Sequence, residues 1–150
     1  MQEIRRANKE DISRIAEILV FTKRVSYRPI FQNDQFSFIN LQVLPLAQEY
    51  QEDKGRLGRT WVFDDGFVKG MLETQGEELT KLYVDSFFQG MGIGAKLMDF
   101  AVSRLGVRFL WALEKNKKAI AFYRTHGFER TGERMLEEGT PEYLVEMERR

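Results

Sequence analysis

A glycine-rich segment at residues 89–95 has the residue types and the spacing to bind a phosphate group. Gly90, Gly92 and Gly94 lie between a strand-like run, residues 79–84, and an amphipathic helix that begins near Gly92. Glycines let the backbone approach a ligand closely, and a helix that opens here directs free N–H groups and its positive dipole end outward. The segment therefore predicts a phosphate-binding loop, and an ordinary glycine-rich turn is the alternative interpretation.

Two common nucleotide-binding motifs do not fit this segment. A Walker loop places Lys and then Ser or Thr after its last glycine, whereas Gly94 is followed by Ala, Lys and Leu. The dinucleotide fingerprint reads G-x-G-x-x-G in a first βαβ unit, whereas this segment reads G-x-G-x-G and lies past the middle of the chain. The pattern is instead Gln-x-x-Gly-x-Gly, after a strand that ends in Leu-x-Val at residues 82–84.

A second distinctive segment spans residues 110–128. A strand is followed by Asn116, and the helix after it carries an Ala, a Phe-Tyr pair and a closing Gly-Phe pair, which are Ala119, Phe122, Tyr123, Gly127 and Phe128. In this order and at this separation, the two segments resemble the signature segments of the GNAT superfamily of N-acetyltransferases. The resemblance covers about residues 78–128.

The resemblance implies an acetyl-CoA site. Family members hold the pyrophosphate on backbone N–H groups of the loop, and the pantetheine arm lies where the preceding strand splays from its parallel neighbour. Val84 N–H is the implied partner of the thioester carbonyl, and Asn116 matches a residue that commonly contacts the cofactor. The implied cofactor-binding residues are Leu82, Val84, Gln89, Gly90, Met91, Gly92, Ile93, Gly94, Ala95, Asn116 and Tyr123.

The loop departs from the family pattern in its charge. Many relatives have a proline and a basic residue around the loop, but residues 85–88 contain neither, and Met91 stands where a basic residue is frequent. The loop would therefore rely on N–H groups and on the helix dipole, which contributes about 0.3–1 kcal/mol per favourable contact. We expect a modest affinity for the cofactor.

Tyr123 and Glu78 are the residues that the resemblance implies in catalysis. Acetyl transfer needs a neutral amine, a donor to the developing oxyanion and a proton for the departing sulfur. Tyr123 matches the usual proton donor to the thiolate, and a buried core tyrosine is the alternative because Ala119 and Ile120 share its face. Glu78 lies where some relatives carry a glutamate that deprotonates the amine, and a solvated pair with Glu77 is its alternative.

Other polar residues fit structural roles at least as well. Glu73 is a weaker candidate for the base. His126, the only histidine, precedes Gly127 and fits a helix C-terminus better than a catalyst. Asn116 also fits a helix cap, which is compatible with a contact to the cofactor. The acidic pair at residues 137–138 fits a solvated turn, and it would also attract a cationic acceptor.

Composition limits the remaining function classes. The length fits one domain over residues 1–150, and without cysteine there is no disulfide, thiolate zinc site or cysteine nucleophile, so neither a metal nor an acyl-enzyme is expected. Lys plus Arg equals Asp plus Glu at 23 each, so the net charge gives no indication of binding to nucleic acid or to an acidic membrane. No apolar run approaches ~20 residues, and the N-terminus lacks a signal-peptide core. We expect a soluble, cytoplasmic protein.

Alternating strand and helix signals position these residues. A strand at residues 2–6 precedes a helix capped by Asn8 with Asp11. An Asp-Gly turn whose two positions need positive φ predicts a hairpin. Further strands are predicted at residues 60–63, 67–72, 78–84, 107–113, 128–135 and 143–147, with helices at 92–106 and 116–127. The order predicts an α/β (α+β) fold: a mixed, mostly antiparallel sheet of about seven strands, with helices on both faces and one splayed parallel pair.

Residues 27–50 predict a loop and one or two helices rich in aromatic residues, with Asp34 as a cap and Pro45 as an interruption. Tyr27 and Phe31 flank the loop and are candidates for an acceptor pocket, with core packing as the alternative. This region and the last hairpin would choose the acceptor. The sequence leaves open small polyamine-like amines, amino-acid derivatives, aminoglycosides and protein N-termini.

We therefore predict an acetyl-CoA-dependent N-acetyltransferase that transfers an acetyl group directly to a primary amine within a ternary complex. A non-catalytic acyl-CoA-binding or sensing domain of the same fold is the alternative from another class, and a relative that uses a longer acyl group is a third. A homodimer through the C-terminal strand is left open.

Overall fold

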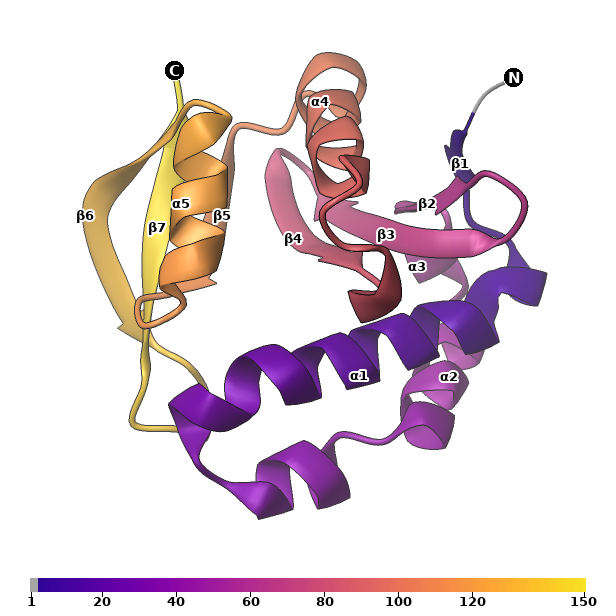
Figure 1. Cartoon of the computed structure of the whole chain (residues 1–150), viewed down its shortest axis with the longest axis horizontal. Coiled ribbons are helices and arrows are strands. Elements are labelled where there is room, and N and C mark those ends of the chain that lie inside the picture. The colour runs from indigo at the N-terminus through magenta and orange to yellow at the C-terminus, as the bar shows by residue number, and fades with distance from the viewer. Residues whose placement is uncertain (1–2) are drawn as a thin grey trace.

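Seven strands form one mixed sheet in the computed structural model, which describes residues 3–150 (Figure 1). The strand order is β1-β2-β3-β4-β5-β7-β6, and every neighbouring pair is antiparallel except β4 and β5, which are parallel. The predicted fold class is confirmed. The first predicted strand is observed from Ile4, and Gln2 lies outside the described residues. The strands are β1 (Ile4–Arg6), β2 (Thr60–Asp64), β3 (Val68–Gln75), β4 (Glu78–Val84), β5 (Phe109–Leu113), β6 (Phe128–Leu136) and β7 (Tyr143–Arg149).

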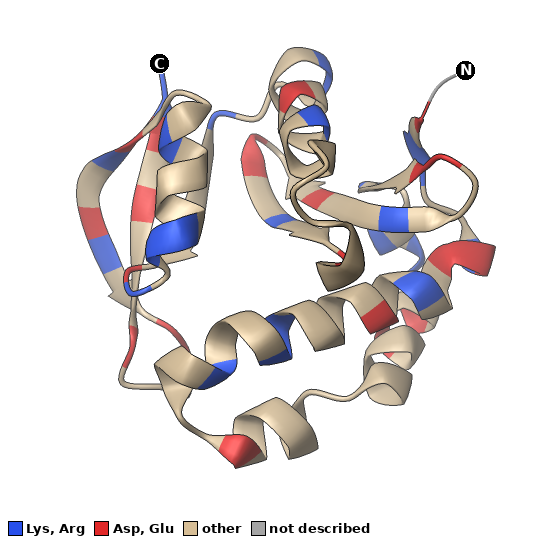
Figure 2. Cartoon of the chain, viewed as in Figure 1, with Lys and Arg blue, Asp and Glu red and all other residues tan. Residues whose placement is uncertain are grey.

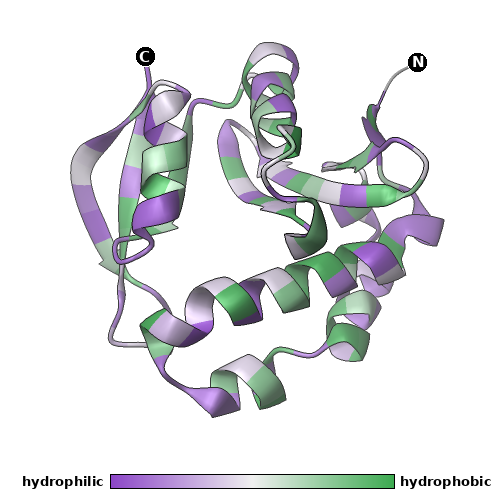
Figure 3. Cartoon of the chain, viewed as in Figure 1, coloured by the Kyte–Doolittle hydropathy of each residue, from purple (hydrophilic) through white to green (hydrophobic). Residues whose placement is uncertain are grey.

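Helices cover both faces of the sheet, and each face has its own apolar core. One core joins α4 and α5 to the sheet, and the other joins α1 and α2 to the opposite face. Apolar residues recur along both α1 and α4 (Figure 3). Within residues 3–150, no helix has the length and apolar character to cross a membrane. The helices are α1 (Ile12–Phe31), α2 (Val43–Glu52), α3 (Lys54–Leu57), α4 (Ile93–Leu105) and α5 (Lys117–Thr125), with single turns η1 (Lys9–Asp11), η2 (Phe36–Asn40) and η3 (Ser86–Phe88).

A bulge in β4 separates the parallel strands. Leu79 pairs with Leu110 of β5 and with Thr74 of β3, but the next pair between β3 and β4 joins Glu73 to Lys81, so Thr80 is an extra residue. Its hydroxyl donates to Glu73 O at 2.9 Å. Because a bulge bends and twists its strand, β4 and β5 diverge beyond Leu79, as the predicted splayed pair requires.

The first helix begins as predicted and ends later than predicted. Asn8 Oδ1 accepts from Glu10 N–H, and Asp11 Oδ2 accepts from Asn8 N–H at 2.9 Å, which completes a capping box. The helix continues through Pro29 to Phe31, so Tyr27 and Phe31 lie on α1 rather than beside a loop. Pro29 has no N–H to donate to the carbonyl four residues before it, and the helix ends two residues later, at Phe31.

Three further local predictions are wrong. Asn33, not Asp34, caps the next helical turn by accepting from Phe36 N–H, because Asp34 pairs with Arg28 at 2.9 Å. Pro45 does not interrupt the chain, because it lies in the first turn of α2, where a missing N–H loses no intrahelical bond.

The third wrong prediction is the conformation of the turn between β2 and β3. The hairpin that these two strands form is confirmed. Only Gly66 adopts a positive φ (138°), and Asp65 does not. The reason is a shift in register at Asp64, which pairs with Val68 and leaves three residues in the loop instead of two.

The C-terminal strand has no free edge at which a second chain could add a strand. β7 pairs with β5 on one side and with β6 on the other, so the free edge at this end of the sheet belongs to β6. Figure 2 shows residues of both charges along β6. Charged side chains on an edge strand oppose pairing with another chain.

Gly70→Ala should destabilise the junction between α4 and the sheet. A Cβ at Gly70 would meet Leu97 Cδ1 at 3.1 Å, Tyr83 O at 3.2 Å and Ile93 Cγ2 at 3.3 Å. Overpacking of this kind lowers the free energy of unfolding by about 1–3 kcal/mol, which urea denaturation can measure. Gly55→Ala is the control, since its Cβ would meet only ordinary contacts, at 3.7 Å and beyond. Equal stability of Gly70→Ala and the wild type would contradict this packing.

Candidate active site

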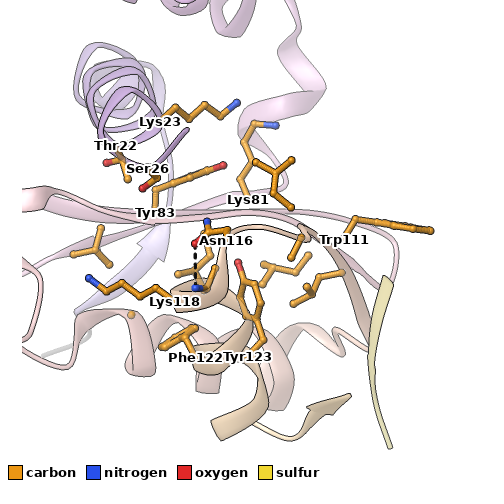
Figure 4. Close-up of a pocket in the computed structure, with 18 of the residues that line it drawn as sticks. Thr22, Lys23, Ser26, Lys81, Tyr83, Trp111, Asn116, Lys118, Phe122 and Tyr123 are labelled. Carbon is orange, nitrogen blue, oxygen red and sulfur yellow. Dashed lines mark hydrogen bonds between the residues drawn. The ribbon is translucent and has the colours of Figure 1, made fainter. Parts of the chain in front are cut away.

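A cavity of about 770 Å³ occupies the gap between β4 and β5. Figure 4 shows that side chains reach it from both faces of the sheet: Lys23, Ser26, Lys81 and Tyr83 on the α1 side, and Asn116, Lys118, Phe122 and Tyr123 on the α5 side. The glycine loop also lines it. β4 is seven residues long and thus spans about 20 Å at ~3.3 Å per residue step. The cavity is therefore lined from the start of β4 to the loop, by residues from both faces of the sheet.

The glycine loop leaves backbone free to contact a ligand. Gly90 and Gly92 have φ of 82° and 81°, which other residues rarely adopt, and a Cβ at either would meet nothing within 4 Å. Gly92 is the N-cap of α4 and has no side chain to occupy the first N–H groups of the helix. The predicted loop residues that line the cavity are Gln89, Gly90, Gly92, Ile93, Gly94 and Ala95. Met91 is not among them and is 65 % exposed.

The backbone of β4 faces the gap at Leu82 and Val84. Asp85 N–H donates to Lys69 O at 2.8 Å, and alternate residues of an antiparallel ladder bond to the same neighbour. Leu82 and Val84 therefore direct their backbone groups away from β3 and towards the side that β5 has left. Gln89 Nε2 donates to Val84 O at 3.2 Å, which ties the loop to this strand.

α5 contributes Asn116 and Tyr123. Asn116 Oδ1 accepts from Ala119 N–H at 3.2 Å and caps the helix, while its side chain also lines the cavity (Figure 4). Tyr123 points from α5 towards the strands (Figure 4) and packs against the rings of Phe122 and Phe128. Burial, followed by the nearby Tyr27, raises the pKa of the Tyr123 phenol well above its usual range. The phenol is therefore protonated at neutral pH and able to donate a proton.

Glu78 lies at the other end of β4 from the loop. Leu79 is buried in the α4–α5 core, so strand alternation directs Glu78 to the opposite, α1 side, and it lines the cavity. Burial raises the pKa of its carboxyl, while Lys81 acts in the opposite direction. Glu73, the weaker candidate, does not line this cavity and instead accepts hydrogen bonds from Tyr50 and Arg56.

Tyr27 and Phe31 lie in different surroundings. Tyr27 lines the cavity and shares a 2.8 Å hydrogen bond between its hydroxyl and that of Tyr83. Phe31 packs edge-on against Phe36 at 4.8 Å between ring centroids and is not part of the lining. The structure thus brings Tyr27, and not Phe31, to the gap.

Several cavity residues were not predicted from the sequence. Lys23 lies one helical turn before Tyr27 on α1, and Lys81 and Tyr83 alternate with Leu82 on β4. Lys23 and Tyr27 are at i,i+4 spacing. Had the sequence analysis extended the first helix to Phe31, this spacing would have predicted that both side chains lie on one face of the helix. Glu137 also lines the cavity, so this member of the acidic pair is not simply part of a solvated turn.

His126 occupies the predicted helix C-terminus. It is the C-cap of α5, and its backbone N–H donates to Tyr123 O at 3.0 Å. Its Nδ1 lies 3.6 Å from Asp99 Oδ1, and it does not line the cavity. In the part of the chain that the structure describes, no three His, Asp or Glu side chains gather as a metal site.

Solved structures with this fold include acetyltransferases bound to CoA ligands. The PaiA N-acetyltransferase of Thermoplasma acidophilum, in complex with coenzyme A, matches at a TM-score of 0.69 and 19% identity, over 99% of each chain. YncA of Salmonella typhimurium, with its cofactor acetyl-CoA, matches at 0.63 and 23% identity, over 96% of this chain and 90% of that one. An N-acetyltransferase from Staphylococcus aureus matches at 0.74 and 14% identity, over 97% and 99%. At these identities, the likeness concerns the fold.

Sequence comparison identifies the family. No curated protein matches this chain. The family model described as acetyltransferase (GNAT) domain matches residues 56–130, which are half of the chain and include the bulged strand, the glycine loop, Asn116 and Tyr123. With the splayed strands, the loop and the fold in agreement, the chain belongs to the GNAT acetyltransferase family.

Proposed function

We propose that this acetyltransferase is an acetyl-CoA-dependent N-acetyltransferase that moves the acetyl group to a primary amine by direct transfer. The observation that carries the proposal is the cavity that passes through the sheet between β4 and β5. The glycine loop, which has the features of a phosphate-binding loop, lies at one end of the cavity, and side chains from α5 and α1 line its two sides. Such a cavity allows a cofactor and an acceptor to meet in the gap from opposite faces.

The α5 side fits a CoA thioester. Two glycines at positive φ and the uncapped start of α4 suit the pyrophosphate, and the backbone of Leu82 and Val84 suits the amide groups of the pantetheine arm. Bound acetyl-CoA would supply the activated acetyl group. Tyr123, with its protonated phenol, would donate a proton to the departing sulfur.

The α1 side fits an amine acceptor. Glu78 has a pKa raised by burial, which makes its carboxylate a better proton acceptor than an exposed glutamate. It would take a proton from the amine, directly or through water, before the attack. The composition supports direct transfer, since the chain has no cysteine to carry an acyl-enzyme.

Calorimetric titration with acetyl-CoA and with CoA tests the cofactor site. The wild type should bind both, and Gly92→Glu should weaken binding because its carboxylate would lie beside the pyrophosphate. Repulsion by a like charge about 4 Å away costs about 1 kcal/mol in bulk water and about 4 kcal/mol near a protein surface. Gly92→Gln is the matched control, with the same backbone strain at φ 81° and no charge. No binding by the wild type up to millimolar concentration would refute the cofactor.

Tyr123→Phe separates an enzyme from a non-catalytic acyl-CoA-binding domain. Loss of the phenolic proton should lower kcat by ~10²–10⁴, while the retained ring leaves the packing and the affinity for CoA nearly intact. Steady-state rates and calorimetry on the same samples measure both. Tyr143→Phe, at an exposed residue outside the cavity, should behave as the wild type. An unchanged rate in Tyr123→Phe would remove this residue from the mechanism.

The pH profile of kcat/KM tests Glu78 as the base. A base must be deprotonated to act, so activity should rise with pH through the pKa of Glu78, which lies above its ordinary value of 4.5. In Glu78→Gln this rise of activity with pH should disappear, and kcat/KM should fall by ~10²-fold or more. Glu77→Gln, an exposed neighbour, is the control. If Glu78→Gln kept both the pH dependence and the rate of the wild type, another group would act as the base.

A further inference from the structure

Two lysines converge on the α1 side of the cavity. Lys23 reaches from α1 and Lys81 from β4, and both ammonium groups point into the same space above the sheet (Figure 4). Lys23 Nζ lies 6.0 Å from the centroid of the Tyr83 ring. Both lysines lie on the face of the sheet opposite Tyr123, and neither belongs to the glycine loop or to α5.

The carboxylates of the protein do not neutralise this pair. Within residues 3–150 Lys23 forms no direct ion pair, and Glu137, which also lines the cavity, acts on it only from a longer distance by raising its pKa. Lys81 Nζ lies 3.8 Å from Glu73 Oε2, but that carboxylate already accepts from Arg56 Nε at 3.1 Å and from Tyr50 at 2.7 Å. The only carboxylate in direct contact with the pair is therefore Glu73, which Lys81 shares with Arg56, and the more distant Glu137 is left to balance Lys23.

Enclosure makes these charges costly without a counter-ion. Burial, and then the charge of Lys81, lowers the pKa of Lys23 to about 8, and burial likewise lowers the pKa of Lys81. A bound anion would relieve both effects, because charge-assisted hydrogen bonds are stronger than neutral ones. Tyr27 and Tyr83 lie beside this space, and their mutual hydrogen bond at 2.8 Å leaves one phenolic O–H to donate.

We propose that the acceptor carries an oxyanion, a carboxylate or a phosphate, in addition to its amine, and that Lys23 and Lys81 hold this oxyanion. The proposal rests on the proposed function and names its substrate class. The amine of such an acceptor lies towards Glu78 and the gap, on the same face of β4 as Lys81. A diamine, by contrast, would bring a second cation against the two lysines.

Matched acceptors test the proposal. L-amino acids are compared with their carboxamides, which have nearly the same size and no negative charge, and O-phosphoethanolamine is compared with ethanolamine, which lacks the phosphate. The wild type should prefer the charged member. Lys23→Met and Lys81→Met keep the length and apolar stem of the side chain, and each should lower kcat/KM for the charged member by about 10- to 100-fold, the range for a hydrogen bond to a charged group. In Lys23→Met the rate with the neutral member should change less than about twofold. Lys81→Met also removes a charge that lowers the pKa of Glu78, so its rates are compared at a pH above that pKa, where the base is ionised in both proteins.

Controls separate recognition from folding and from the cofactor. Lys54→Met makes the same substitution at an exposed position on α3, outside the cavity, and should leave both rates as in the wild type. Calorimetry with CoA should give the same affinity for Lys23→Met as for the wild type. A binding readout without turnover is titration of the CoA-saturated protein with N-acetylated amino acids and their amides.

The outcomes are distinct. Preference for amino acids identifies a carboxylate, and preference for phosphoethanolamine identifies a phosphate; either preference, lost in the lysine variants, supports the proposal. Equal use of charged and neutral members, or no charged compound acetylated or bound by a protein that binds CoA, overturns it. Equal loss with both members in Lys23→Met also overturns it, since Lys23 would then act in catalysis or folding. Failure of the wild type to bind CoA would instead refute the proposed function.

Discussion

One extra residue in β4 is the constraint on which the rest of the site depends. The bulge at Thr80 follows directly after the last parallel pair, Leu79 with Leu110, and turns β4 away from β5. Without this separation β5 would bond to the backbone of Leu82 and Val84, and the sheet would be continuous where the cavity now lies. The bulge also resets the alternation of side chains, so that Leu79 enters the α4–α5 core while Lys81 and Tyr83 face α1.

The gap gives the two faces of the sheet different chemistry. The α5 side offers a phenol, an amide and the start of α4, and the α1 side offers ammonium groups, hydroxyls and carboxylates. A reaction between two substrates benefits from this division, because each reactant is held by its own set of groups and they meet only in the gap. Lys118 adds a cation on the α5 side, where the loop itself has no basic residue.

The site is held by packing on both faces rather than by a few strong contacts. Leu97 and Met98 of α4 are fully buried against the sheet, and Gly70 lets this helix approach β3 closely. On the other face, Tyr50 fixes Glu73, which in turn approaches Lys81. The positions of the loop and of the lysines are therefore set in part by residues of α2, α4 and β3 that do not line the cavity.

The sequence by itself determined the order of strands and helices, the parallel crossover around α4, the glycine loop and the positions of Asn116 and Tyr123. These features depend on local spacing, capping and glycine conformations, which short stretches of chain encode. Only the tertiary structure decided the bulge at Thr80, the course of α1 through Pro29 and the meeting of Lys23 with Lys81. A strand's register and the convergence of side chains from distant elements depend on packing between those elements, and no local pattern carries that information.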